Sequence, residues 1–194
     1  MRALALAVAL ATALFVSTVA ADPATPAATP PDTPSPWAQA ARKYDLDPLA
    51  LYGIALQESR RYFDDNQVRP WPWTLHTPEE GGLYFDSFEN AAKKLRELIA
   101  SGRTNIDIGL MQLSLLWQKH RVADPVQLLK PEINIEVAAA ILREHLDQFG
   151  ELRLAIARYH SARLDRGVPY AASVLTIIEH LRRLEEVQIA LGEG

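Results

Sequence analysis

Glu58 is the residue whose type and setting best suit acid–base chemistry. Asp47 can cap a helix, Pro48 suits its first position, and Leu51 and Ile54 recur at helical spacing, with Glu58 on the same face. Burial disfavours the charged form of a carboxyl group, so Glu58 would keep its proton to a higher pH than usual. A carboxyl group that is protonated near neutral pH can act as a general acid. The alternative is a glutamate at the edge of the apolar stripe that pairs with a neighbouring arginine.

Two later stretches carry groups that could assist such an acid. The string Gly-Leu-Met-Gln at residues 109–112 falls at a predicted junction between a loop and a helix. Gln112 can donate and accept hydrogen bonds, and Gly109 tolerates backbone conformations that other residues resist. The last stretch ends in Tyr159 and His160. The ordinary alternatives are a polar residue that caps a loop and a half-buried aromatic on a helix face.

Together, Glu58-Ser59, the Gly-Leu-Met-Gln string and the segment Ala-Ile-Ala-Arg-Tyr-His at residues 155–160 resemble the motifs of the soluble lytic transglycosylase family. The resemblance covers about residues 37–184 and implies a goose-type-lysozyme-like α fold. The third motif of the family usually reads Ala-Tyr-Asn, followed by a small residue and Gly. Here an arginine precedes Tyr159, His160 stands in place of the Asn, and no Gly follows closely. The interval between Glu58 and the second motif is also longer than in compact members.

The resemblance implies a peptidoglycan substrate, cleaved at the β-1,4 linkage between MurNAc and GlcNAc. Glu58 would protonate the glycosidic oxygen, and the acetamido group of the substrate would stabilise the cationic intermediate. The ionised Glu58 would then take the proton of the muramyl 6-hydroxyl, which leaves a 1,6-anhydro product. Two alternatives stay open: a hydrolytic muramidase of the same fold, which needs a second carboxylate, and a non-catalytic peptidoglycan-binding scaffold domain. Asp107 is the nearest acidic residue, and its position is typical of a capping residue.

The same resemblance implies substrate-binding roles for the other motif residues. Tyr159 would place its hydroxyl near Glu58 and orient it. Gln112 would hydrogen-bond an acetamido group or a sugar hydroxyl. Met111 would form an apolar wall of the cleft or fill the core, and Ser59 would bond to substrate or to the backbone.

His160 could replace the usual Asn as one hydrogen-bond partner of the substrate. Trp71 and Trp73 could stack on sugar faces at the cleft rim, although tryptophans in a proline-rich loop more often hold the loop down. We expect no cofactor and no metal site, since the five histidines show no metal-ligand spacing.

The elements that must position these residues are mostly helices, and we predict an all-α, lysozyme-like domain with a small irregular or β-hairpin excursion. Residues 63–86 form the excursion because proline and glycine interrupt two short extended pieces. Helices are predicted over residues 37–44, 48–60, 87–100, 113–120, 134–149 and 152–161. Pro169 is predicted to open a last long helix, with its inward face formed by Val174, Ile177, Leu181 and Leu184.

The N-terminal part has the composition of targeting and spacer segments. Residues 1–21 combine Arg2, an apolar run and small residues that permit cleavage after Ala20 or Ala21, which predicts a signal peptide; an uncleaved anchor is the alternative. Residues 22–36 read as a proline-rich linker, and residues 37–190 as the catalytic domain. No later stretch is apolar for long enough to cross a membrane. We therefore expect an exported protein, periplasmic or secreted.

Composition excludes some other classes of function. The net charge of −4 argues against a nucleic-acid binder, and the absence of cysteine excludes disulfides and thiolate metal sites. The expected partner is the glycan strand of peptidoglycan. Transglycosylases of this type often open the wall for secretion, conjugation or flagellar assembly, which makes such an assembly a candidate partner.

Overall fold

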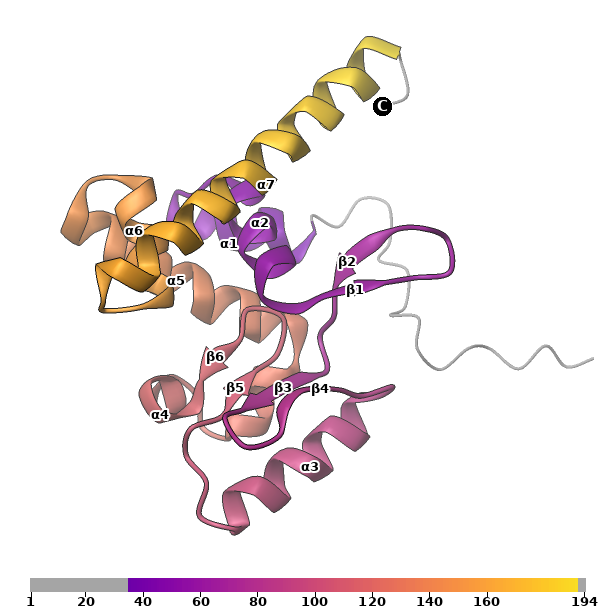
Figure 1. The fold of residues 1–194 in the computed structure, drawn as a ribbon, viewed down its shortest axis with the longest axis vertical. Coiled ribbons are helices and arrows are strands. Elements are labelled where there is room, and N and C mark those ends of the chain that lie inside the picture. The colour runs from indigo at the N-terminus through magenta and orange to yellow at the C-terminus, as the bar shows by residue number, and fades with distance from the viewer. Residues whose placement is uncertain (1–34, 192–194) are drawn as a thin grey trace, which may run out of the picture.

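The computed structural model describes residues 35–191, which form an α-rich domain with small antiparallel sheets (Figure 1). The first half contains α1 (Pro36–Tyr44), α2 (Pro48–Ser59), β1 (Arg60–Tyr62), β2 (Val68–Pro70), β3 (Thr74–Thr77), β4 (Gly81–Tyr84) and α3 (Phe88–Ala100). The second half contains β5 (Asp107–Ile108), β6 (Leu113–Ser114), α4 (Leu115–Gln118), η1 (Lys119–Arg121), η2 (Pro125–Leu129), α5 (Pro131–Phe149), α6 (Leu152–His160) and α7 (Leu164–Leu191). The predicted fold class is confirmed.

Local sequence sets several of the helix ends, although α5 begins at Pro131 and not at the predicted residue 134. The Asp47 side chain caps α2 by accepting a hydrogen bond from the Leu49 N–H at 2.8 Å. Ser87 caps α3 by accepting from the Asn90 N–H at 3.2 Å. Gly150 ends α5 in the left-handed conformation, which glycine adopts without a steric penalty. The helix that ends at Glu58-Ser59 is therefore held at its start by residues recognisable in the sequence.

The helical part of the molecule surrounds α2. Helix α7 packs along α6 and α2, and α6 also packs on α5 (Figure 1). The close approach of α2 and α7 depends on Gly53, since a Cβ at this position would lie 2.7 Å from Cγ1 of Ile178. Leu51 and Ile54 are fully buried in this core. Burial of apolar side chains along one face of α2 thus fixes where its C-terminal end lies.

The sheet part of the molecule is larger than the predicted excursion. Strands β1 and β2 form a hairpin, and a second, antiparallel sheet has the order β4-β3-β5-β6. Residues 107–108 and 113–114 are strands of this second sheet, where a loop and the start of a helix were predicted. Strands this short show no alternation in the sequence. They exist because β5 pairs with β3, which lies far from it along the chain.

Helix α7 differs from the prediction in the residue at which it begins and in the residues that form its buried face. It begins at Leu164, so Pro169 lies inside it; the missing N–H costs one helical hydrogen bond near an exposed end. Ile178 is buried in place of Ile177, and Leu184 is 49% exposed. The C-terminal half of α7 projects beyond the rest of the domain, which leaves Leu184 without a core to pack against (Figure 1).

The predicted signal peptide (1–21) and almost all of the predicted linker (22–36) lie outside the described residues. At the boundary, Ser35 caps α1, which begins at Pro36. No helix within residues 35–191 combines the length and apolar character that crossing a membrane requires.

Candidate active site

A cavity of about 680 Å³ lies beside the C-terminal end of α2. Its wall combines residues of the helical part with residues of the sheet that contains β5 and β6. The lining side chains are Glu58, His76, Asn105, Asp107, Gln112, Leu113, Ser114, Trp117, Gln118, Ile141, Tyr159, His160, Ser161 and Arg166. Glu58 therefore faces a cavity from the end of its helix, as the sequence predicted.

Burial gives Glu58 the protonation behaviour expected of a general acid. The residue is half-buried, and withdrawal from water raises the pKa of its carboxyl group to about 7. A hydrogen bond from the Tyr170 hydroxyl to Oε1, 2.5 Å long, acts in the opposite direction by favouring the charged form. The charge of Asp107 raises the pKa further. At neutral pH the carboxyl group therefore exists in both protonation states.

Tyr170, on α7, is the direct partner of this carboxyl group. Burial, and then the charge of Glu58, raise the pKa of its hydroxyl, so Tyr170 stays protonated and donates to Glu58. The imidazole of His160 lies parallel to the Tyr170 ring, with centroids 4.1 Å apart and planes 7° apart. Burial lowers the pKa of His160, which favours its neutral form. The stacked pair holds the hydroxyl against Glu58.

The contact predicted between Tyr159 and Glu58 is not made. The Tyr159 hydroxyl donates instead to the main-chain oxygen of Met111, at 2.8 Å. Tyr170 has the role predicted for Tyr159, and it was missed because it lies outside the three motifs. The available signal was spacing, since Tyr170 lies four residues before Val174 and so on the buried face of α7.

The turn at residues 109–112 is a hydrogen-bonding centre to which the other two motifs attach. Ser59 Oγ donates to the Leu110 carbonyl at 2.8 Å, and Tyr159 donates to the Met111 carbonyl. Gln112 has a φ of 45° and donates from Nε2 to the Gly109 carbonyl at 2.8 Å. A non-glycine residue rarely adopts this φ, so the surrounding bonds must hold it there. The motifs converge mainly through the backbone of this turn.

Asn134, on α5, fixes the turn from behind, and no sequence pattern had singled it out. Its side chain is buried and accepts from the Met111 N–H at 2.8 Å. It also donates to the Ile108 and Leu128 carbonyls, at 2.9 and 2.7 Å. Gly109, with a φ of 78°, makes room for it, because a Cβ there would lie 2.5 Å from the Asn134 amide nitrogen. Two of these buried bonds thus hold the turn and the end of β5 against α5, and the third joins α5 to η2.

The structure divides the residues predicted to bind substrate into two groups. Gln112, Tyr159 and His160 line the cavity. Ser59 and Met111 are buried and do not line it. Of the two alternatives predicted for each, Ser59 has the local, backbone-bonding role and Met111 fills the core.

A second carboxylate faces the same cavity. Asp107, on β5, lies opposite His76 of β3, with Oδ2 3.5 Å from His76 Nδ1. Burial raises the pKa of Asp107, and His76 partly offsets this. The prediction that Asp107 is a capping residue is wrong, since it pairs within a sheet. Within residues 35–191, no group of three or more His, Asp or Glu side chains could hold a metal ion.

Neither tryptophan proposed to stack on sugar lies at the cavity. Trp71 is buried and donates from Nε1 to the Phe85 carbonyl at 2.8 Å, with its ring edge-on to Trp73. Both therefore hold their loop down. Trp117, on α4, lines the cavity and is 69% exposed. The sequence did offer a signal for Trp117, because this large aromatic residue follows closely after the Gly-Leu-Met-Gln string. The helical segment that carries it is too short to bury it.

In the comparison with protein families, residues 35–166 match a family described as the transglycosylase SLT domain. The matched range includes Glu58, the turn at 109–112 and Tyr159, and ends before Tyr170. Comparison with curated proteins and comparison with solved structures each returned no significant match.

Proposed function

The chain belongs to the transglycosylase SLT domain family, and from this premise we propose that it is a peptidoglycan lytic transglycosylase. It would cleave the β-1,4 linkage from MurNAc to GlcNAc and leave a 1,6-anhydro-MurNAc end. The observation that carries the proposal is the state of Glu58, a carboxyl group facing a cavity with its pKa raised to about 7 by burial. Such a group can both give and take a proton near neutral pH.

The reaction requires Glu58 to act twice. Protonated Glu58 gives its proton to the glycosidic oxygen as the bond from that oxygen to the anomeric carbon breaks. The acetamido oxygen of the same sugar bonds to the anomeric carbon and spreads the positive charge. Ionised Glu58 then accepts the proton of the 6-hydroxyl, whose oxygen displaces the acetamido oxygen. The carboxyl group returns to its starting state and water is not consumed.

Tyr170 determines which carboxyl oxygen takes part. Its hydroxyl donates to Oε1, so Oε1 accepts this bond in both protonation states and Oε2 carries the transferable proton. The bond stabilises the carboxylate once its proton has left. It thereby keeps the pKa of Glu58 below the value that burial alone would give.

A hydrolytic muramidase is the second candidate, and Asp107 is the observation that favours it. A second carboxylate in the same cavity could activate a water molecule on the other face of the sugar, as inverting glycosidases do. Its engagement with His76 weighs against this role, because a general base must be free to accept a proton. A non-catalytic scaffold would have no need of the half-buried, cavity-facing Glu58.

Export to the periplasm or beyond is also part of the proposal, supported by the signal-like pattern of residues 1–21 and the proline-rich residues 22–36. A specialised role in opening the wall for an envelope-spanning secretion, conjugation or flagellar assembly would use such a spacer. Deletion of residues 1–21 should retain the protein in the cytoplasm, as measured by cell fractionation. Unchanged export would refute the signal.

The proposed activity is tested by digestion of purified sacculi with mass spectrometry of the products. Wild-type protein should release muropeptides with 1,6-anhydro ends. Glu58→Gln keeps the shape of the side chain and should lower release by about 10²–10⁴-fold. The matched control is Glu97→Gln on the exposed face of α3, which should digest as wild type does. Wild-type-like release by folded Glu58→Gln would refute Glu58 as the acid, and reducing ends would identify a hydrolase.

A further inference from the structure

Trp117 is a large aromatic side chain that the fold leaves in solvent. It is 69% exposed on α4 and lines the cavity that contains Glu58. Within residues 35–191 it makes no hydrogen bond and no contact with another ring. An aromatic face of this kind in a polar cavity is suited to stack on the C–H face of a pyranose ring, and an aromatic side chain adds large contact area at low conformational cost.

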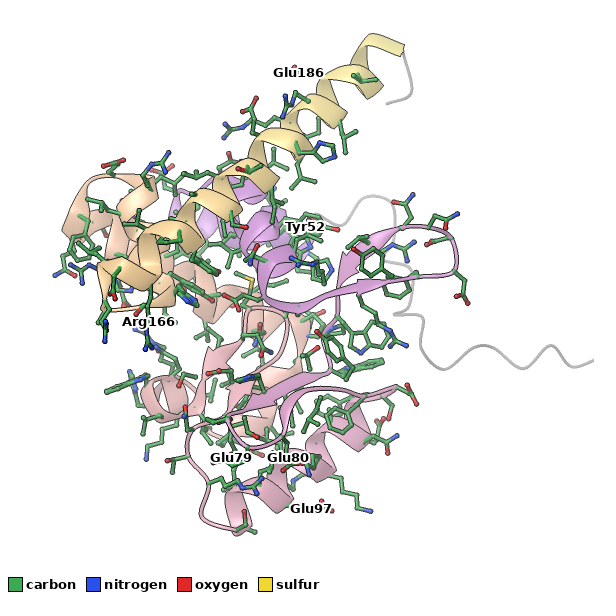
Figure 2. The ribbon with its side chains drawn as sticks, in the orientation of Figure 1. Tyr52, Glu79, Glu80, Glu97, Arg166 and Glu186 are labelled. Atoms are coloured by element: carbon green, nitrogen blue, oxygen red, sulfur yellow. The ribbon has the colours of Figure 1, made fainter. Side chains whose placement is uncertain are left out.

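Arg166 is a charged residue that the described structure likewise leaves without a partner. It lies in the first turns of α7 and lines the same cavity; in Figure 2 it lies on the side of α7 that faces α4. Nearby Arg163 is bound to Asp165 at 2.6 Å, whereas no side chain within residues 35–191 pairs with the Arg166 guanidinium. A guanidinium presents donors in a planar fork that matches a carboxylate.

The other ionisable groups on the described wall of the cavity do not compete for Arg166. Asp107 lies beside His76, and Glu58 is occupied by the Tyr170 hydroxyl and keeps its proton up to a pH of about 7. Arg166 therefore brings a positive charge and open guanidinium donors to the cavity, and the adjacent Asp165, whose pKa that charge helps to lower, offsets only part of the charge because its carboxylate is bound to Arg163. A ligand that reaches it would gain by carrying a negative one.

We infer that Trp117 and Arg166 form a substrate-binding pair, in which the indole stacks on a sugar ring and the guanidinium pairs with a carboxylate on the same glycan strand. This inference rests on the proposed function and names the class of strand that the cavity prefers, namely an acidic glycan. Two sources supply that carboxylate in peptidoglycan. One is the free lactyl group of a MurNAc that has lost its peptide, and the other is a carboxylate of the peptide stem.

The test measures binding by isothermal titration calorimetry with the full chain in the Glu58→Gln form, which does not turn the ligands over. Three oligosaccharides of equal length serve as ligands: a GlcNAc oligomer with no carboxylate, a peptide-free GlcNAc-MurNAc strand, and the same strand with peptide stems. Trp117→Ala should weaken binding of all three by about tenfold or more. Its control is Tyr62→Ala, which removes a comparably exposed aromatic from β1, outside the cavity.

Arg166→Gln should weaken binding of a carboxylate-bearing strand by about tenfold at low salt and leave the GlcNAc oligomer unchanged. Whichever acidic strand loses affinity identifies the source of the carboxylate. The control is Arg96→Gln, which changes an exposed arginine of α3 outside the cavity and should bind all three ligands as the parent does. Equal losses of Arg166→Gln for charged and uncharged ligands, or binding of either variant that matches its control, would overturn the pair.

Digestion of sacculi by the same substitutions in the wild-type background separates the two proposals. If wild-type protein digests sacculi and both variants bind and digest like their controls, the pair fails and the proposed function stands. If wild-type protein digests nothing but the binding pattern above holds, the pair stands and the proposed activity fails.

Discussion

Glu58→Gln should stabilise the folded protein at alkaline pH and leave its stability almost unchanged at acid pH. The carboxyl group has an ordinary pKa of 4.5 when unfolded and a pKa of about 7 in the folded protein. Below pH 4.5 it is protonated in both states and contributes nothing to the pH dependence. Between these values unfolding releases a proton, so raising the pH favours the unfolded state. Above the folded pKa the whole of this stability has been lost.

The size of the effect follows from the two pKa values. A difference from 4.5 to about 7, at about 1.4 kcal/mol per pKa unit, corresponds to about 3 kcal/mol. Glutamine has no proton to lose, and its side-chain oxygen can still accept the Tyr170 hydroxyl. The variant should therefore be more stable than wild type by about 3 kcal/mol at pH 8, which is about 6–12 °C in Tm for a domain of this size.

Chemical denaturation of both proteins at pH 4.5, 6, 7 and 8 checks this result. The difference in unfolding free energy should grow across this range and level off above pH 7. Glu97→Gln, which makes the same change on the exposed face of α3, should differ from wild type by a small and constant amount. A difference for Glu58→Gln that does not change with pH would refute the argument that burial holds the proton on this carboxyl group.

Three further substitutions test the groups around Glu58. Tyr170→Phe should lower muropeptide release by about ten- to a hundredfold and move the alkaline limb of the pH–rate profile to higher pH, because loss of this hydrogen bond to the carboxylate raises the pKa of Glu58; an unmoved limb would contradict this. Tyr159→Phe should cost about 1 kcal/mol in thermal unfolding and leave that limb in place, since its bond is to the Met111 carbonyl. Asn134→Leu should cost at least about 3 kcal/mol of unfolding free energy, because it leaves three buried backbone groups unpaired. A smaller loss would mean that the turn at 109–112 keeps its conformation without the hydrogen bonds of Asn134.

Much of the fold was predictable because its signals are local. The caps at Asp47 and Ser87 and the apolar face of α2 act within one or two turns of helix, so they can be recognised without a partner. Strands β5 and β6 were missed for the opposite reason. Each has two residues; β5 pairs with β3, which lies far from it along the chain, and β6 joins the sheet only by pairing with β5.

The sequence by itself determined the candidate acid, the helix that carries it and the turn that faces it. These depend on residue type and short-range spacing, and the family match covers the same segments. Only the tertiary structure decided which side chain touches Glu58, which tryptophan reaches the cavity, and that Ser59 and Met111 turn away from it. Tyr159 and Tyr170 are both aromatic residues on buried helix faces, and the packing of α7 on α2 brings the second to the carboxyl group. Contacts between residues 112 positions apart follow from how the helices pack, and no local pattern encodes that.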